Sequence, residues 1–452
     1  MLQEIFNHVD LHFNEMVNDL KEVCTFRSVA GDTNGLESTR KYLIKKWKSI
    51  GLSTKRFSID EGNDLLYAED FGKREKTVLF YNHYDVVEEG PLKEWKSDPY
   101  TADIRNGYIY ARGISDNKGP IFSRIHAIQA ILAVMGELPV NVKFITEGDE
   151  EITSPSLWRF CQEQEELFRE MSKADLCIWE NGWKDAEGRP WMQFGVRGGI
   201  AFEMRVKTAN SDAHSRMGSI LPSAAWRLVW ALASLKDTSD RVLIEGFYDD
   251  VLPITEQDIS ALEAFPYEEE QLKQRMGLKN FVNDLTGLEL KKKMYLTPAL
   301  HINGFTAGEM HNGKRMIVPH EAYAVCDFNL VVAQKPEDIF AKIRKHLDTH
   351  GFSDVELKMC GALTPIRTRL DTPFKQLITQ AAQKVYEKPM IYEITQLGGG
   401  PGYAFQRAWP DMPIIGIGPA NTGSNHHSPN ENLNLDDYKK SIKLIIATLC
   451  SI

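Results

Sequence analysis

The sequence predicts an α/β protein in which a mixed sheet is flanked by helices and interrupted by an inserted α+β domain. The 452 residues exceed the roughly 100 to 200 that one domain usually holds. Apolar runs of strand length alternate with helical periodicity towards both ends of the chain. Between about residues 198 and 360 the pattern changes. We therefore expect a first domain made of residues 1–197 and 361–452, with residues 198–360 inserted as a second domain.

The elements expected in the first domain are short and well separated. Residues 36–50 show the spacing of an amphipathic helix, and Thr77–Tyr81 is a compact apolar run of strand length. Further elements continue the alternation, which favours a sheet covered by helices. They are a helix at 120–134 and strands at 141–146, 175–179 and 413–417.

The inserted domain is expected to combine a small sheet with helices. Its strands are predicted at 201–206, 298–302 and 322–332, and its helices at 224–235 and 336–350. The acidic segment 237–293 has no clear strand pattern and is expected to be a helical elaboration of this domain. The large aromatic residues Trp47, Trp226 and Trp230 are expected to belong to the core rather than to contact a cofactor.

Composition limits the partners and the compartment. Acidic residues outnumber basic ones by 63 to 53 and no dense cluster of Lys and Arg occurs, so a nucleic-acid partner is not expected. The sequence contains no run of about 18 apolar residues, so we expect no membrane-spanning helix. The six cysteines are widely spaced, and the first residues form an amphipathic pattern rather than a secretion signal. We therefore expect reduced cysteines and a cytoplasmic protein.

Potential metal ligands follow several of the predicted strands or lie in turn-rich loops. Because the carboxyl ends of strands in an open α/β sheet border one crevice, these side chains are expected to converge. Two imidazoles and three carboxylates suit two divalent ions, most naturally Zn²⁺, with Mn²⁺ or Co²⁺ as alternatives. A metal would also compensate the like charges of adjacent Glu150 and Glu151. The candidate ligands are His83, Asp116, Glu151, Glu180 and His427.

Five sequence blocks resemble motifs of one family, the co-catalytic dizinc peptidases and deacylases. This family includes carnosine-type dipeptidases, acetylornithine deacetylase, succinyl-diaminopimelate desuccinylase and glutamate carboxypeptidase relatives. The blocks occur in the family's order, and the resemblance spans nearly the whole chain. They are Tyr81–Val86 (H-x-D), Ala111–Pro120 (G-R-G-x-x-D-x-K-G), Glu147–Glu151 (E-G-x-E-E), Ser211–Ser215 (D-x-H-S) and His427–Glu431 (H-S-x-N-E).

The resemblance implies a zinc-peptidase-like catalytic domain with an inserted lid and dimerisation domain. It implies that His83 and Glu180 hold one metal ion and that Glu151 and His427 hold the other. Asp116 would bridge both ions, with neighbouring His426 a weaker competitor for the place of His427.

The resemblance also implies the catalytic roles and the reaction. Asp85 would orient His83, the task that carboxylates commonly take behind a metal-bound histidine. Glu150 would be the general base that activates water for attack on an amide carbonyl, and His214 would stabilise the developing oxyanion across a homodimer. The expected reaction is hydrolysis of an amide or peptide bond in a small peptide or an N-acyl amino acid.

The substrate-contacting positions depart from the family pattern. Asn329 stands where related dipeptidases carry an arginine for the substrate carboxylate, and Gly399 and Gly400 lie in a loop that often contains serine. Arg216 is a candidate for replacing the missing cation. Glu180 favours an N-acyl substrate, whereas the long segment 237–293 resembles the dipeptidase-like branch, so the exact bond stays open.

Three alternatives compete with parts of this interpretation. The same ligands would suit a two-metal phosphoesterase. A metal-stabilised binding protein without activity would also explain them, although it needs no free base such as Glu150. Asp116 is also a candidate N-cap for the helix that follows it.

Overall fold

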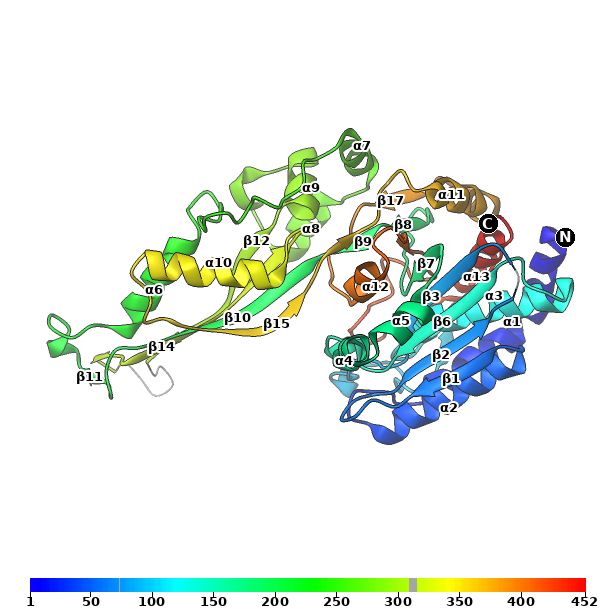
Figure 1. Ribbon diagram of the computed structural model, residues 1–452, viewed down its shortest axis with the longest axis horizontal. Helices are drawn as coiled ribbons and strands as arrows, with labels where there is room; N and C mark the ends of the chain where they lie inside the picture. The colour runs from blue at the N-terminus through cyan, green and yellow to red at the C-terminus, as the bar shows by residue number, and fades with distance from the viewer. Residues whose placement is uncertain (73, 309–314) are drawn as a thin grey trace. The chain divides into compact units, whose positions relative to one another are not determined.

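The computed structural model describes residues 1–72, 74–308 and 315–452. Over these residues the chain divides into two compact units (Figure 1). The first unit comprises Met1–Gly195, Thr368–Ile394 and Ala404–Ile452, and the second comprises Val196–Arg367 and Thr395–Tyr403. The second unit is thus inserted between segments of the first. The sequence-based domain limits, at residues 197/198 and 360/361, remain a prediction of where independently folding domains begin and end.

The first unit is built on a mixed sheet of eight strands in the order β1-β2-β6-β3-β7-β18-β8-β17. Strands β6, β3, β7 and β18 run parallel at its centre, and β1 and β2 are antiparallel at one edge. Every residue of β3 and β6 is buried, as expected of parallel strands covered on both faces. The strands are β1 Ser53–Phe57, β2 Leu65–Asp70, β3 Thr77–His83, β6 Asn141–Glu147, β7 Leu176–Trp179, β8 Trp191–Gln193, β17 Ile391–Glu393 and β18 Ile414–Gly416.

Helices cover this sheet and agree with the predicted pattern. The helices α1, α3 and α13 pack together, with α3 against β3, while α5 packs against β6 and α2 against β1 and β2 (Figure 1). A separate small sheet of β4, β5 and β19 lies in the same unit. The bounds are α1 Leu2–Cys24, α2 Thr33–Ser49, α3 Gly119–Met135, α4 Pro155–Glu163, α5 Glu165–Ser172, α11 Pro373–Tyr386, α12 Gly402–Ala408, α13 Leu435–Leu449, β4 Asp103–Arg105, β5 Tyr108–Tyr110 and β19 Asn432–Asn434.

The second unit is an antiparallel sheet in the order β12-β14-β10-β15, with helices α6 and α10 packed on it. Alternate residues of β14 are buried, so one face of the sheet meets these helices and the other does not. The segment 237–293 contains the helices α7, α8 and most of α9. The bounds are β10 Gly198–Lys207, β12 Ala299–Ala307, β14 Glu321–Leu330, β15 Glu356–Leu363, α6 Ala224–Leu235, α7 Glu256–Ala264, α8 Glu269–Met276, α9 Gly287–Leu296 and α10 Pro336–Thr349.

The predicted fold class is confirmed, but one prediction about the core is wrong. Trp47 is buried, whereas Trp226 and Trp230 are 60% and 55% exposed. These two rings stack 5.8 Å apart on the outer side of α6. They are four residues apart and so share a helix face, which is not the face that carries the buried Leu228 and Leu235.

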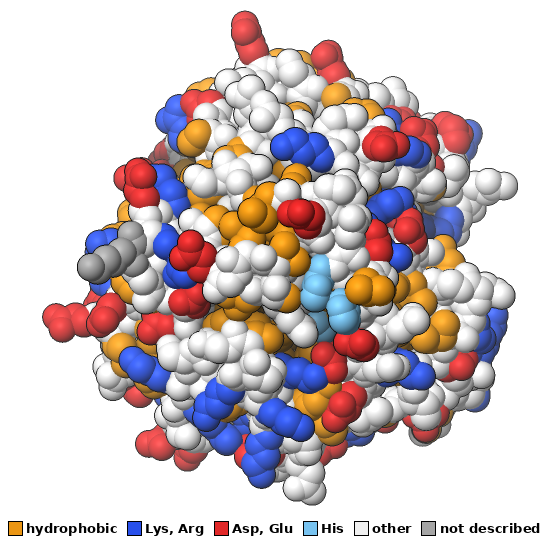
Figure 2. Space-filling view, turned by 90° about the vertical axis from the view of Figure 1, so that its right-hand side faces the viewer, with side chains coloured by type: hydrophobic (Ala, Val, Ile, Leu, Met, Phe, Trp, Pro, Cys, Tyr) orange, Lys and Arg blue, Asp and Glu red, His pale blue; other side chains and the backbone are white. Residues whose placement is uncertain are grey.

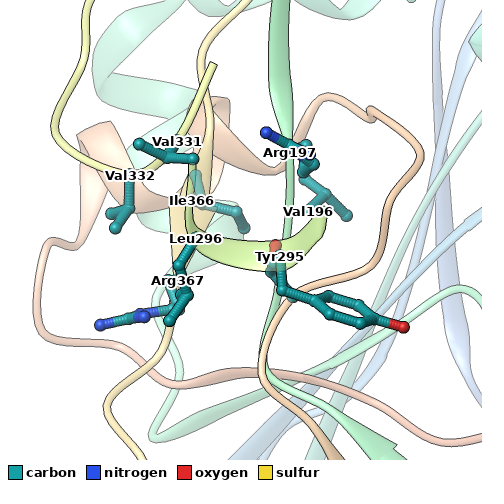
Figure 3. Close-up of a pocket in the computed structure, with 9 residues that line it drawn as sticks. Val196, Arg197, Tyr295, Leu296, Val331, Val332, Ile366 and Arg367 are labelled. Atoms are coloured by element: carbon teal, nitrogen blue, oxygen red, sulfur yellow. The ribbon is translucent and has the colours of Figure 1, made fainter. Parts of the chain in front are cut away.

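A small cavity in the second unit lies beside the end of α9 (Figure 3). Valine, leucine and isoleucine side chains line it together with Tyr295, Arg197 and Arg367. The guanidinium of Arg197 donates to the carbonyl oxygens of Met294 and Thr297, each at 2.6 Å. A cation at the carboxyl end of a helix satisfies carbonyls that lack partners within the helix. Arg197 therefore ties α9 to the start of β10.

The surface carries charges of both signs. On the face drawn in Figure 2, lysine and arginine side chains are interspersed with aspartate and glutamate. Within the described ranges, no helix combines the length and the apolar composition that crossing a bilayer requires. The expectation that nucleic acid is not a partner stays a prediction.

Candidate metal centre

The site in the first unit is assembled from the carboxyl ends of three neighbouring parallel strands. His83 is the last residue of β3 and lies in register with Glu147 at the end of β6. A short 3₁₀ turn, Glu150–Ile152, follows β6, and Glu180 directly follows β7. Because these strands are adjacent and parallel, their ends lie together at one edge of the sheet.

Asp116 lies at the centre of the group. Its Oδ1 is 3.0 Å from His83 Nε2, and its Oδ2 is 3.2 Å from His426 Nδ1 and 3.4 Å from His427 Nε2. The side chain of Asn181 donates to Oδ1 at 3.0 Å. Asp116 does not cap the following helix, because α3 begins at Gly119 and Lys118 is its N-cap residue. Its carboxylate instead faces three imidazoles.

His83 is held from both sides of its ring. Nδ1 lies 3.2 Å from the backbone oxygen of Asp85 and 3.4 Å from its Oδ1, while Nε2 faces Asp116. The other carboxylate oxygen of Asp85 accepts the backbone N–H of Glu151 at 3.0 Å. Asp85 thus contacts two of the predicted ligand residues at once. On the Nε2 side, Glu180 Oε2 lies 3.8 Å away.

The two adjacent histidines of the last loop have different surroundings. His427 Nε2 lies 3.1 Å from Glu151 Oε2, although its side chain is 55% exposed. The side chain of His426 is only 14% exposed, and its ring lies against that of Trp183 at 4.4 Å between centroids. Sequence reasoning ranked His426 below His427, because the motif register indicated only the second.

The carboxylates of the site carry more negative charge than its histidines can neutralise. Burial raises the pKa of Glu150 well above its ordinary value, and the carboxylate of Glu180 adds to this effect. Burial also raises the pKa of Glu180, to about 8. Hydrogen bonding to Asp116 and Glu151 raises the pKa of His427 to about 10. Carboxylates this close together disfavour their ionised forms unless a cation lies among them.

The donor atoms fit divalent metal ions. Two atoms bound to one ion at about 2.0 to 2.2 Å lie roughly 3 to 3.5 Å apart. His83 Nε2 and Asp116 Oδ1 are 3.0 Å apart, and His427 Nε2 is 3.4 Å from Asp116 Oδ2 and 3.1 Å from Glu151 Oε2. Ligand atoms of His83, Asp116 and Glu151 all lie within 4.8 Å of one another. Buried oxygens of Glu151 and Glu180 have no hydrogen-bond partner in the described structure, so they are available as ligands.

Glu431 positions the loop that carries Asp116, a role that sequence reasoning missed. Its Oε2 accepts from Arg112 Nη1 and the Gly113 N–H at 2.8 Å each, and its Oε1 accepts from the N–H and hydroxyl of Ser115. The N–H of Asp116 also donates to Oε1, at 3.1 Å. A buried carboxylate with five donors holds the backbone of this loop in one conformation. Its place in the H-S-x-N-E block was the available signal.

The remaining predicted residues belong to the second unit. His214 ends β11 (Ala213–His214), and its Nδ1 accepts the N–H of exposed Arg216 at 3.2 Å. Asn329 Nδ2 lies 3.2 Å from the Nε2 of His301 on β12. A Cβ atom at Gly399 would lie 2.6 Å from Leu363 Cδ1, so a larger residue there would displace that leucine side chain, and the adjacent Gly400 is buried. The roles of these residues stay predictions.

Comparison with known proteins gives matches over nearly the whole chain. The family model described as peptidase family M20/M25/M40 matches residues 79–451. A Beta-Ala-His dipeptidase of Mus musculus is 28% identical over 99% of this chain and 94% of its own length. A Cys-Gly metallodipeptidase of Schizosaccharomyces pombe is 24% identical over 98% of this chain and 96% of its own length.

Among solved structures, an M20 family metallo-carboxypeptidase from Sulfolobus solfataricus has the same fold. It is 33% identical, covers 97% of this chain and 99% of its own, and superposes with a TM-score of 0.88. The resemblance inferred from the five sequence blocks is thereby confirmed.

Proposed function

This chain belongs to peptidase family M20/M25/M40, and from that membership we propose that it releases a C-terminal amino acid from dipeptides and N-acyl amino acids. The general class, a metal-dependent hydrolase of peptide or amide bonds, is confirmed by the family match and by the named relatives. The phosphoesterase and the inactive binding protein are not favoured.

Asp116 is proposed as the bridge between two metal ions. One ion would be held by His83 and Glu180 and the other by Glu151 and His427. The single observation that carries this proposal is the pair of contacts on Asp116, with His83 on one carboxylate oxygen and His427 on the other. The mixed imidazole and carboxylate donors suit Zn²⁺, with Mn²⁺ and Co²⁺ as alternatives.

The side chains around the ions would divide the work of hydrolysis. Bound there, two divalent ions would polarise the substrate carbonyl and lower the pKa of a shared water molecule. Glu150 follows the same strand as Glu151 and would accept the proton of the attacking water, then return it to the departing amine. Asp85 would keep Nε2 of His83 directed at the centre, and His214 would donate to the developing oxyanion.

We infer the leaving group of the reaction from the relatives and the acyl group from Glu180. The relatives named above include dipeptidases and a carboxypeptidase, both of which release a C-terminal residue. Glu180 favours acceptance of an N-acyl group. Asn329 and Gly400 carry neither charge nor hydroxyl, so recognition of the substrate carboxylate is assigned to Arg216 in the second unit.

A homodimer in the cytoplasm is proposed from the surface of the second unit and from the cysteines. Trp226 and Trp230 are stacked and exposed on α6, and the edge strand β12 exposes Ile302 and Phe305. Exposed large apolar side chains and an open sheet edge support a protein–protein contact on this unit. All six cysteines are free, as expected in a reducing compartment.

The proposed function is tested by release of free amine from a panel of dipeptides, N-acyl dipeptides and N-acyl amino acids. The native protein is compared with Glu150→Gln after both have been loaded with Zn²⁺. We expect Glu150→Gln to bind the same amount of metal and to lose about 10²- to 10⁴-fold in kcat. If Glu150→Gln retains the native rate, Glu150 is not the base. If no substrate of the panel is cleaved by the metal-loaded native protein, the substrate class is wrong.

A further inference from the structure

The side chain of His426 is packed in a defined orientation beside the proposed metal centre. Its side chain is 14% exposed, and the ring of Trp183 lies against it at 4.4 Å with an angle of 32° between the planes. Nδ1 lies 3.2 Å from Asp116 Oδ2. The other ring nitrogen, Nε2, is buried and has no hydrogen-bond partner within the described residues. The ring is therefore packed on one side and directed at a carboxylate on the other.

The backbone turns so that two consecutive imidazoles reach the same oxygen. His427 has a φ of 58°, in the left-handed region that a residue with a side chain seldom adopts. His427 presents its outer nitrogen, Nε2, to Asp116 Oδ2 at 3.4 Å, whereas His426 presents its inner nitrogen, Nδ1, at 3.2 Å. The different reach of the two nitrogens allows neighbouring residues to converge on one point.

The spacing matches shared coordination. Atoms that bind one ion at about 2.0 to 2.2 Å lie roughly 3 to 3.5 Å apart, and the 3.2 Å from His426 Nδ1 to Asp116 Oδ2 falls in this range. We propose that His426 is a further ligand of the ion on the Oδ2 side of Asp116, together with His427 and Glu151. This assignment rests on the proposed two-metal centre and goes beyond its expected ligand set.

A second imidazole has a definite consequence for this ion. Nitrogen donors favour Zn²⁺ and Co²⁺ over the oxygen-preferring ions Mn²⁺ and Mg²⁺. The ion on the Oδ2 side is therefore expected to bind Co²⁺ more tightly than Mn²⁺. Loss of His427 alone should weaken this site without abolishing it, because His426 remains.

The test is titration of metal-free protein with Co²⁺, followed by visible absorption and by competition with a chelating dye. The variants are His426→Ala, His427→Ala and the double variant, with His12→Ala on α1 as a matched control away from the site. We expect two Co²⁺ ions in the native protein and the control. Each single variant should lose at least about tenfold in affinity at one site and show an altered spectrum for that ion. The double variant should bind one ion.

Three results would overturn the assignment. If His426→Ala keeps the native affinity and spectrum, His426 is not a ligand. If its affinity falls but its spectrum does not change, His426 is a hydrogen-bond donor to Asp116 instead. If the native protein binds fewer than two ions, the two-metal centre is itself wrong and the assignment falls with it. Circular dichroism of each metal-free variant checks the fold, and His426→Gln replaces His426→Ala if the latter does not fold.

Discussion

The two units hold their predicted functional residues in different ways. In the first unit His83 and Glu151 lie at or just after the ends of buried parallel strands, Asp116 lies in the loop before α3, and ligand atoms of the three lie within 4.8 Å of one another. In the second unit His214 and Arg216 are exposed and contact each other only through one backbone N–H. The proposed metal centre is thus defined by contacts between strand ends and loops of one unit. The exposed residues of the second unit have few contacts from which a role could be inferred.

Removal of metal is expected to give the largest difference between the units. With the metal chelated, activity should be lost, and the free energy of unfolding of the first unit should fall by about 4 kcal/mol for each bound ion, relative to protein in a thousandfold excess of ion over its Kd. Hydrogen exchange read by mass spectrometry, with and without chelator, measures both units in one sample. Equal loss of protection in Val196–Arg367 would contradict the assignment of all metal ligands to the first unit.

The substitution Glu431→Gln is expected to have the second-largest effect on stability. The amide would place a donor against Arg112 or Ser115, whose groups now donate to the carboxylate. Loss of about two charge-assisted hydrogen bonds should lower the free energy of unfolding of the first unit by about 3 kcal/mol. Urea denaturation measures this change, and Glu356→Gln at an exposed position of β15 is the control. A change below about 0.5 kcal/mol in Glu431→Gln would show that the loop does not depend on Glu431.

Sequence reasoning predicted the sheet, and it predicted that His83, Asp116 and Glu151 lie close together, because both depend on local patterns. A buried parallel strand is a continuous apolar run, and a polar residue directly after it stands at the sheet edge, as His83 and Glu180 do. The role of Glu431 depends on hydrogen bonds to the backbone of a loop more than 300 residues away in sequence. The H-S-x-N-E block marks Glu431 as part of a motif, but neither segment shows which groups its carboxylate binds.

Two other differences between expectation and structure have causes of their own. The motif register indicated His427 alone, whereas the place of the His426 ring beside Asp116 depends on the directions of two adjacent rings, which the register does not contain. The exposure of Trp226 and Trp230 is visible in helical periodicity, because Leu228 and Leu235 define the buried face of α6. There the general tendency of tryptophan to be buried outweighed the pattern.

Arg197→Met tests how the second unit is held together. Methionine fills the space beside the cavity but donates no hydrogen bonds, so the carbonyls of Met294 and Thr297 lose their partner. We expect a loss of about 2 kcal/mol in the unfolding free energy of the second unit, measured by urea denaturation with native metal content. Arg205→Met, at a half-exposed position of β10, should change it by less than about 0.5 kcal/mol. Equal effects of both variants would refute the helix-capping role.

The smallest expected effect concerns acid stability of the first unit. Hydrogen bonds from Arg56 lower the pKa of Glu37 to about 2, with a smaller contribution from Arg40. A carboxylate with a lowered pKa stabilises the fold above its ordinary pKa of 4.5, and this stabilisation is lost as the pH falls towards about 2. The Glu37 side chain is 29% exposed, so the effect should be below about 1 kcal/mol.

Glu37→Gln should therefore remove part of the loss in stability that native protein shows between pH 5 and pH 2.5. The measurement is urea denaturation at both values. Glu321→Gln in the second unit is the matched control, because Glu321 also pairs with an arginine, Arg205. An unchanged pH dependence in Glu37→Gln would show that solvent screens the pair completely.

The division of the first unit among three chain segments affects how the protein is made. The ribosome completes Val196–Arg367 before it adds the last segment, Ala404–Ile452. Because domains generally fold as units during synthesis, most of the second unit is free to fold while the first is incomplete. His427 and Glu431 arrive only in that last segment. The proposed centre therefore cannot close on the nascent chain until the whole second unit has been translated.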